Sequence, residues 1–109
     1  MRKTCIVVPC YNEADRLKTG EFLDWARRRP DLHFLFVNDG STDGTQEKLD
    51  SLSRACPERI CTIHLERNCG KAEAVRRGFL ESFVSGFDVV GYWDADLATP
   101  LETIPRFCK

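Results

Sequence analysis

The sequence predicts an α/β fold, a parallel β-sheet with helices on both of its faces. Four short apolar runs alternate with helical patterns along the chain, and this alternation is typical of parallel sheets joined by right-handed crossovers. The apolar runs lack the polar alternation of a half-exposed strand, which indicates strands buried on both faces. A chain of 109 residues is long enough for one hydrophobic core. We therefore expect one domain over residues 1–109.

Each predicted strand is a short run rich in β-branched and aromatic residues. The predicted strands are, in chain order, Thr4–Pro9, Leu32–Val37, Ile60–Leu65 and a run from Phe87 onward that stops on Asp94 and Asp96. A polar, glycine-containing turn follows several of these runs, as expected where buried strands leave a sheet.

Three helical patterns separate the strands, and a fourth begins near the end of the chain. The first has Phe22 and Ala26 on its apolar face and closes at Pro30. The second follows a polar turn in which Asp43 is expected to have a structural role at the helix start. The fourth begins at Thr99–Glu102, which reads as a cap, a proline and a capping-box glutamate. The third carries its expected apolar face at Ala72, Val75, Phe79 and Phe83.

Composition excludes several classes of partner. The net charge of −1 leaves no basic field to hold nucleic acid or an anionic membrane surface. The sequence contains neither a stretch of apolar residues long enough to cross a bilayer nor a signal-peptide core. Its six cysteines form no Cys-x-x-Cys pair and are interpreted as reduced thiols. We therefore expect a soluble, cytoplasmic protein with a small-molecule partner.

Asp94 and Asp96 end the last strand and are separated by one residue. In extended backbone their side chains point to the same side, where two carboxylates either raise one pKa or share a cation. Mg²⁺ takes one or two carboxylates and completes its shell with phosphates and water. The pair therefore indicates a nucleoside diphosphate site. An isolated Asp-x-Asp is more often an ordinary turn, so this interpretation depends on the rest of the chain.

Other polar residues follow the carboxyl ends of the predicted strands, and these ends meet at one edge of a parallel sheet. Three known phosphate sites do not fit. A dinucleotide fingerprint would need glycines where Pro9–Glu13 stands. A P-loop fails because Ala72 follows Gly70–Lys71, and the aspartate phosphotransferases fail because Ala98 replaces their Thr or Val. The residues expected to converge are Tyr11, Glu13, Asp39, Lys71, Asp94 and Asp96.

Four motifs occur in order over essentially the whole chain. They are Val7–Glu13, Val37–Thr45, Arg67–Lys71 with Ala74–Arg76 and Gly78, and Asp94–Asp96. Together they resemble the family 2 inverting glycosyltransferases. The resemblance implies the N-terminal, nucleotide-binding half of a GT-A fold, with a Rossmann-like parallel sheet. Residues 96–100 are most similar to the polyprenyl- or dolichyl-phosphate sugar transferases.

The resemblance also implies a nucleoside site. Pro9 and Tyr11 are expected to pack on the nucleobase, with Glu13 near the nucleoside. Asp39 is expected to accept a hydrogen bond from a ring N–H of the base, a contact that discriminates between bases. The donor implied is a UDP- or GDP-sugar.

The diphosphate and the sugar have their own expected partners under the same resemblance. Lys71 reaches the base edge or the diphosphate from the start of its helix, and Asp94 contacts the ribose or the sugar. Asp96 ligates Mg²⁺ or Mn²⁺ that bridges the diphosphate. Trp93, just before the pair, is either core or a wall of the sugar pocket.

No catalytic residue is assigned, because the base that deprotonates the acceptor is expected beyond residue 109. The implied acceptor is a polyprenyl phosphate or a growing glycan, and the full-length protein is expected at the cytoplasmic face of a membrane. Two other classes remain open: a non-catalytic nucleotide-sugar-binding module or a truncated fragment of such an enzyme, and a regulatory flavodoxin-like domain that binds Mg²⁺. An absent acceptor half would expose apolar surface beside the last strand and favour self-association.

Overall fold

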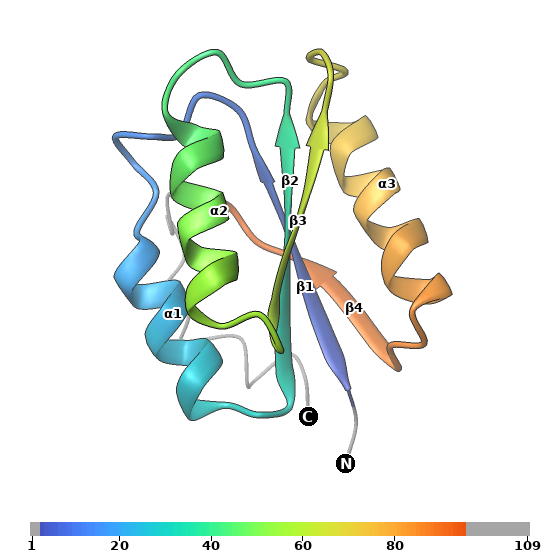
Figure 1. Ribbon diagram of the computed structural model, residues 1–109. Helices are drawn as coiled ribbons and strands as arrows, with labels where there is room; N and C mark the ends of the chain where they lie inside the picture. Colours follow the sequence, from blue (N-terminus) through green and yellow to red (C-terminus); the bar gives the residue numbers. More distant parts are fainter. Residues whose placement is uncertain (1–2, 96–109) are drawn as a thin grey trace.

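The structure, a computed structural model, describes residues 3–95. Within this range, strands and helices alternate along the chain in the predicted order (Figure 1). The strands are β1 (Thr4–Cys10), β2 (Leu32–Asp39), β3 (Ile60–Leu65) and β4 (Val89–Tyr92). The helices are α1 (Thr19–Arg28), α2 (Thr45–Ala55) and α3 (Lys71–Val84). The helix expected at Thr99–Glu102 lies outside the described residues.

The strands form one parallel sheet in the order β3-β2-β1-β4. β1 is central: its first residue, Thr4, pairs with Leu32 of β2 on one side and with Val89 of β4 on the other. The chain therefore steps outward from β1 to β3 and then returns past its starting point. This reversal of direction lies between β1 and β4.

The helices cover both faces of the sheet, as predicted. α1 and α2 lie on one face and α3 lies on the other (Figure 1). The physical reason is the handedness of the crossovers. The crossover from β3 to β4 runs back across the sheet, so a crossover of the same hand places α3 on the opposite face.

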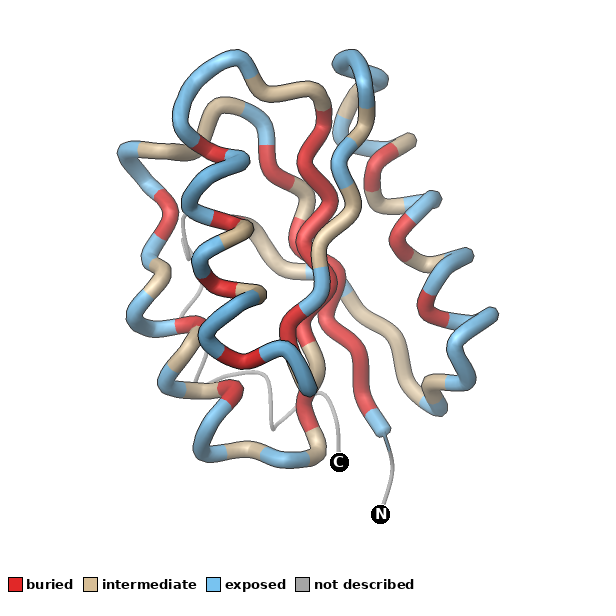
Figure 2. The backbone as a smooth tube through the Cα atoms, viewed as in Figure 1, coloured by how far each residue is buried: buried red, intermediate tan, exposed pale blue. Residues whose placement is uncertain are grey.

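Alternate side chains of β1 and β2 fill two separate cores, which explains the runs of buried residues in these central strands (Figure 2). Because successive side chains of a strand point to opposite faces, both faces of β1 and β2 must be apolar. The core under α1 and α2 includes Ile6, Val8, Phe34, Phe36 and Phe22. The core under α3 includes Cys5, Val7, Leu35, Val37 and Ala74.

α3 contacts the sheet mainly through small residues, which corrects part of the predicted apolar face. Its buried residues are Ala74, Gly78 and Ser82, spaced four apart. Of the expected face, Phe79 packs against the core under α3, whereas Phe83 is 59% exposed. A Cβ atom at Gly78 would lie 2.4 Å from Cγ1 of Val7. The helix therefore lies too close to β1 for a larger residue at Gly78.

Three strand ends differ from the prediction. β1 continues one residue further, to Cys10, and β2 continues to Asp39, which pairs with Leu65 of β3. β4 ends earlier, at Tyr92, so Asp94 lies in the segment that follows the strand. Asp96 lies outside the described residues, so the expected same-side geometry of the two carboxylates stays a prediction.

Replacing Gly78 by alanine tests the close approach of α3. Alanine improves helix propensity by up to about 1 kcal/mol where nothing obstructs it. Here the new methyl group would meet buried, β-branched Val7, which has little rotamer freedom. We expect Gly78→Ala to lower the free energy of unfolding by about 1–3 kcal/mol, measured by urea denaturation.

Gly20 of α1 provides the matched control, because no atom lies within 4 Å of the Cβ position there. Gly20→Ala should leave stability unchanged or raise it slightly. The packing of α3 described above is incorrect if Gly78→Ala proves as stable as Gly20→Ala.

Candidate functional site

A cavity of about 300 Å³ opens beyond the carboxyl ends of β1 and β4. Ligands of open α/β sheets bind at the point where the strand order reverses, which is this point. A larger groove of about 520 Å³, between α1 and α2, contains none of the predicted site residues. The residues that line the smaller cavity are Pro9, Glu13, Lys71, Asp94 and Ala95. The structure thus brings together four residues predicted for one site.

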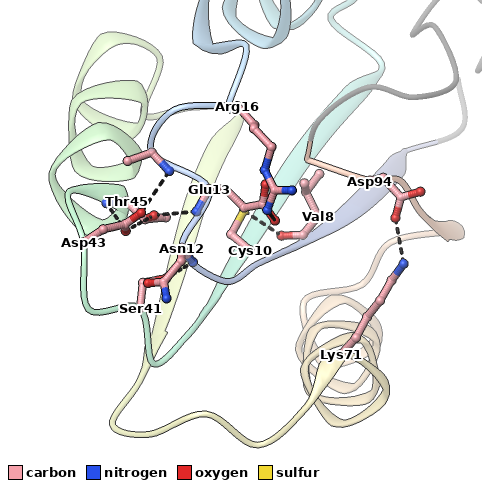
Figure 3. A network of polar contacts seen from close by, with 11 residues as sticks. Val8, Cys10, Asn12, Glu13, Arg16, Ser41, Asp43, Thr45, Lys71 and Asp94 are labelled. Atoms are coloured by element: carbon pink, nitrogen blue, oxygen red, sulfur yellow. Dashed lines mark hydrogen bonds and ion pairs between the residues drawn. The ribbon is translucent and has the colours of Figure 1, made fainter.

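Lys71, the first residue of α3, reaches across the cavity to the loop after β4 (Figure 3). Its Nζ lies 2.8 Å from Oδ1 of Asp94 and 5.6 Å from the ring centroid of Tyr92. The side chains of Lys71 and Asp94 are 60% and 48% exposed. An exposed ion pair of this kind contributes about 0–1 kcal/mol, so a ligand can rearrange it at little cost.

Trp93 contributes to the core rather than to the cavity. Its backbone N–H donates a hydrogen bond to the carbonyl of Val7, 3.0 Å away. Its side chain packs against the core under α1 and α2. Trp93 is not among the residues that line the cavity. The choice that the sequence left open is therefore decided in favour of the core.

Glu13 enters the cavity from the loop after β1 and is held at both its side chain and its backbone (Figure 3). Its Oε1 lies 3.0 Å from Nη2 of Arg16, and its backbone N–H donates to Oγ1 of Thr45 at 2.9 Å.

Cys10, the last residue of β1, lies close to Glu13 in the chain. Burial and the nearby charge of Glu13 raise the pKa of the Cys10 thiol to about 12. Cys10 is therefore a neutral, structural thiol at physiological pH.

Asn12 joins the loop after β1 to the loop after β2. Its φ of +50° lies in the left-handed region, which Asn tolerates better than most residues. Its N–H donates to Oγ of Ser41 at 3.0 Å, and its Oδ1 accepts from the N–H of Thr42 at 2.8 Å. The sequence interpretation missed this role, although Asn beside a predicted site was the available signal.

Asp43 has the structural role expected of it at the start of α2, with Thr45 as its main partner. Its Oδ1 accepts from the N–H of Thr45 at 2.9 Å and from the hydroxyl group of that residue. Its Oδ2 accepts from the N–H of Ala14 at 3.3 Å. Hydrogen bonding, chiefly from the Thr45 hydroxyl, lowers the pKa of Asp43. Thr45 is buried and links Asp43 to Glu13, another role that the sequence interpretation missed.

Two predicted nucleoside contacts lie outside the cavity lining. Tyr11 is 44% exposed. Asp39 is 2% exposed, and its carboxylate accepts hydrogen bonds from the turn that precedes α3. The roles of Tyr11 and Asp39 at the base stay predictions.

The residues at the cavity suit a hard divalent cation in ligand type. Glu13 and Asp94 supply carboxylate oxygens, which Mg²⁺ and Mn²⁺ prefer. Within residues 3–95, however, no group of three or more His, Cys, Asp or Glu residues is arranged to hold a metal ion. Asp96, the predicted ligand, lies outside the described residues, so its role as a ligand stays a prediction.

The parallel sheet, with its reversal point between β1 and β4, defines an α/β domain of the Rossmann-like class. The family model described as "Glycosyl transferase family 2" matches residues 5–109. The chain belongs to glycosyl transferase family 2, and the predicted family is confirmed.

A curated relative supports the subfamily that the sequence indicated. Over 111 residues the chain is 34% identical to the undecaprenyl-phosphate 4-deoxy-4-formamido-L-arabinose transferase of Salmonella choleraesuis (strain SC-B67). The match covers 97% of this chain and 32% of the relative. The chain therefore spans about a third of the length of the curated relatives it matches.

Solved structures confirm the predicted GT-A fold. A mannosyltransferase from Pyrobaculum calidifontis in complex with GDP-Man and Mn²⁺ matches with a TM-score of 0.76 at 24% identity, covering 94% of this chain and 30% of that one. The glucosyl-3-phosphoglycerate synthase from Mycobacterium tuberculosis, in complex with Mn²⁺, UDP and glucosyl-3-phosphoglycerate, matches with a TM-score of 0.66 at 19% identity. That match covers 96% of this chain and 39% of the synthase.

Proposed function

We propose that residues 1–109 form the donor-binding part of a glycosyltransferase, which binds a nucleoside diphosphate sugar at the cavity beyond β1 and β4. The observation that carries this proposal is the convergence of Pro9, Glu13, Lys71 and Asp94, which belong to three separate motifs, on one cavity. The complexes of the structural relatives with GDP-Man and with UDP support it.

Lys71 binds the diphosphate in this proposal. Its ammonium group is exposed and held weakly by Asp94, so an incoming phosphate oxygen can replace the carboxylate. Its backbone begins α3, where the helix dipole favours negative charge. Both effects place positive potential on the same side of the cavity.

The acidic side chains orient the sugar and the ribose. Asp94, once its partner Lys71 turns to phosphate, has an oxygen available to accept from a hydroxyl group, and Glu13 faces the same cavity. Pro9 provides an apolar surface on which the nucleoside packs, and the half-exposed ring of Tyr11 extends that surface. These contacts fix the donor relative to the carboxylates.

Asp96 binds a divalent cation, Mg²⁺ or Mn²⁺, in this proposal, and the Mn²⁺ in two structural relatives supports it. The cation supplies positive charge that stabilises the departing nucleoside diphosphate. The contribution of this chain is to present carboxylate oxygens beside Lys71. Charges of both signs at one cavity suit a ligand that carries a metal and phosphates together.

The acceptor is a polyprenyl phosphate, as the name of the curated relative indicates for that protein, and the sugar is transferred with inversion. None of the helices within residues 3–95 is long and apolar enough to cross a bilayer. We place the site in the cytoplasm, with the whole protein at the cytoplasmic face of a membrane that holds the acceptor.

The proposal predicts metal-dependent nucleotide binding. Isothermal titration calorimetry with UDP and with GDP, each with and without Mn²⁺, should show tighter binding of at least one nucleotide when Mn²⁺ is present. Asp96→Asn should remove most of that metal-dependent gain, because an amide is a poorer ligand for a hard cation. The role of Asp96 is contradicted if the variant retains the full Mn²⁺ effect.

Asp24 of α1 supplies the control for a lost carboxylate, because it forms an exposed ion pair with Arg28 away from the cavity. Asp24→Asn should bind both nucleotides as the parent does. Absence of binding to the parent under all four conditions would contradict the donor-site proposal itself.

Lys71→Met should weaken nucleotide binding roughly 10- to 100-fold, the loss expected for one hydrogen bond to a charged group. Arg28→Met is a matched control, since Arg28 also forms a 2.8 Å exposed ion pair and is 61% exposed. Both changes should alter the free energy of unfolding by about 0–1 kcal/mol. Equal nucleotide affinities for the two variants in calorimetry would show that Lys71 does not bind phosphate.

The alternative is a module that binds the donor and transfers nothing. The carboxylates described near the cavity have other roles in this proposal. Glu13 pairs with Arg16, Asp39 accepts from backbone N–H groups and Asp43 accepts from Thr45. Asp94 turns from Lys71 to the bound donor. Inverting transfer needs a general base within reach of the acceptor hydroxyl. We therefore assign no such base within residues 3–95.

Incubation of the purified 109-residue chain with radiolabelled UDP-glucose or GDP-mannose, Mn²⁺ and a polyprenyl phosphate checks this point. We expect donor binding without label in the lipid phase. Label that enters the lipid phase at the rate of a whole transferase would show that a base is present within the chain.

A further inference from the structure

The loop after β1 directs three consecutive backbone N–H groups at the segment that precedes and begins α2 (Figure 3). The acceptors are side-chain oxygens of residues 41–45. The N–H of Asn12 donates to Oγ of Ser41 at 3.0 Å, that of Glu13 to Oγ1 of Thr45 at 2.9 Å, and that of Ala14 to Oδ2 of Asp43 at 3.3 Å. An N–H group shielded from water needs an acceptor, so residues 41–45 determine the path of this loop.

Thr45 is the buried member of this set of acceptors. Its exposure is 0%, whereas Asp43 is exposed and Ser41 is intermediate. The hydroxyl group of Thr45 donates to Oδ1 of Asp43 and accepts from the backbone N–H of Glu13. Because its single proton is committed to Asp43, an oxygen lone pair is aimed at the N–H of Glu13.

The backbone of Glu13 is held on both sides by buried residues. Thr45 accepts from its N–H, and its carbonyl accepts at 2.8 Å from the N–H of Leu17, which lies in the core under α1 and α2. The partner of the Glu13 side chain, Arg16, is by contrast 60% exposed, and such an ion pair orients a side chain only weakly. The position of the Glu13 carboxylate therefore depends on its backbone.

Glu13 lines the donor cavity, and Thr45 is not among the lining residues. We propose that Thr45 is a positioning residue: through the backbone N–H of Glu13 it holds that carboxylate at the cavity. Its contribution to nucleotide binding passes through Glu13, since a fully buried hydroxyl presents no surface to a ligand. This inference rests on the proposed function, because it concerns how one wall of the donor site is held.

Double-mutant cycles distinguish positioning from a general loss of stability. Thr45→Val removes the hydroxyl group and is combined once with Glu13→Ala and once with Lys71→Met. All variants are titrated with UDP and with GDP in the presence of Mn²⁺. We expect Thr45→Val to weaken binding roughly 3- to 10-fold in the parent and in the Lys71→Met background, but less than about twofold in the Glu13→Ala background.

Equal losses in all three backgrounds would overturn the proposal, because a role elsewhere in the fold does not depend on Glu13. Unchanged binding in Thr45→Val would overturn it as well. Thr4→Val is the matched control, since Thr4 is also buried but begins β1, at the end opposite the Glu13 loop. It should bind both nucleotides as the parent does.

Amide hydrogen exchange, followed by nuclear magnetic resonance, tests the positioning without any ligand. Exchange at the amide of Glu13 should rise at least about tenfold in Thr45→Val and stay at the parent rate in Thr4→Val. Unchanged exchange in Thr45→Val would contradict the proposal. If the parent binds neither nucleotide, the proposed function fails, while the exchange measurement still decides whether Thr45 holds Glu13.

Thr45→Ser tests whether the hydroxyl group is the part that matters, because it removes only a methyl group. It should restore parent exchange at Glu13 and bring nucleotide affinity to within about twofold of the parent, even where the lost methyl group lowers stability. A Thr45→Ser variant as impaired as Thr45→Val would rule out the hydroxyl bond as the cause.

Asp43→Ala provides a second route, should Thr45→Val fail to fold. Asp43 is exposed, and its loss removes the acceptor that orients the Thr45 hydroxyl. We expect the same faster exchange at Glu13 and the same coupling to Glu13→Ala. Losses that are additive with Glu13→Ala would contradict the proposal by this route too.

Discussion

The pairing of β1 with a parallel strand on each side is the constraint on which the site depends. β2 lies on one side of β1, and β4 lies on the other side. The chain leaves β1 towards α1, whereas α3 lies on the opposite face (Figure 1). The connections therefore separate at the carboxyl end of β1, and none of the helices within residues 3–95 fills that position. Glu13 and Asp94 reach the cavity because their loops follow these two neighbouring strands.

The walls of the cavity combine rigid loops with a weakly held ion pair. Half-buried hydrogen bonds join the loops after β1 and β2 through Asn12 and Thr45, and Asp39 joins the end of β2 to the turn before α3. Each such bond contributes about 0.5–1.5 kcal/mol net, and more where a charge is involved. The exposed pair of Lys71 and Asp94 is weaker. A ligand can thus exchange contacts with this pair while the surrounding loops keep their positions.

Large apolar side chains remain exposed at the end of α3 and on β4. Leu80, Phe83 and Val84 are 51%, 59% and 83% exposed, and Tyr92 of the edge strand is 51% exposed. The expected self-association through apolar surface stays a prediction, since nothing in the described residues shows what covers these side chains.

The sequence by itself determined the strands, their order along the chain and the edge at which Pro9, Glu13, Lys71 and Asp94 meet. Local patterns suffice for these features, because buried strands are continuous apolar runs and parallel strands end at one edge. The tertiary structure alone decided that Asp39 faces the turn before α3. That outcome depends on two residues of extra strand and on hydrogen bonds to residues about thirty positions away, and no local pattern in a sequence specifies such partners.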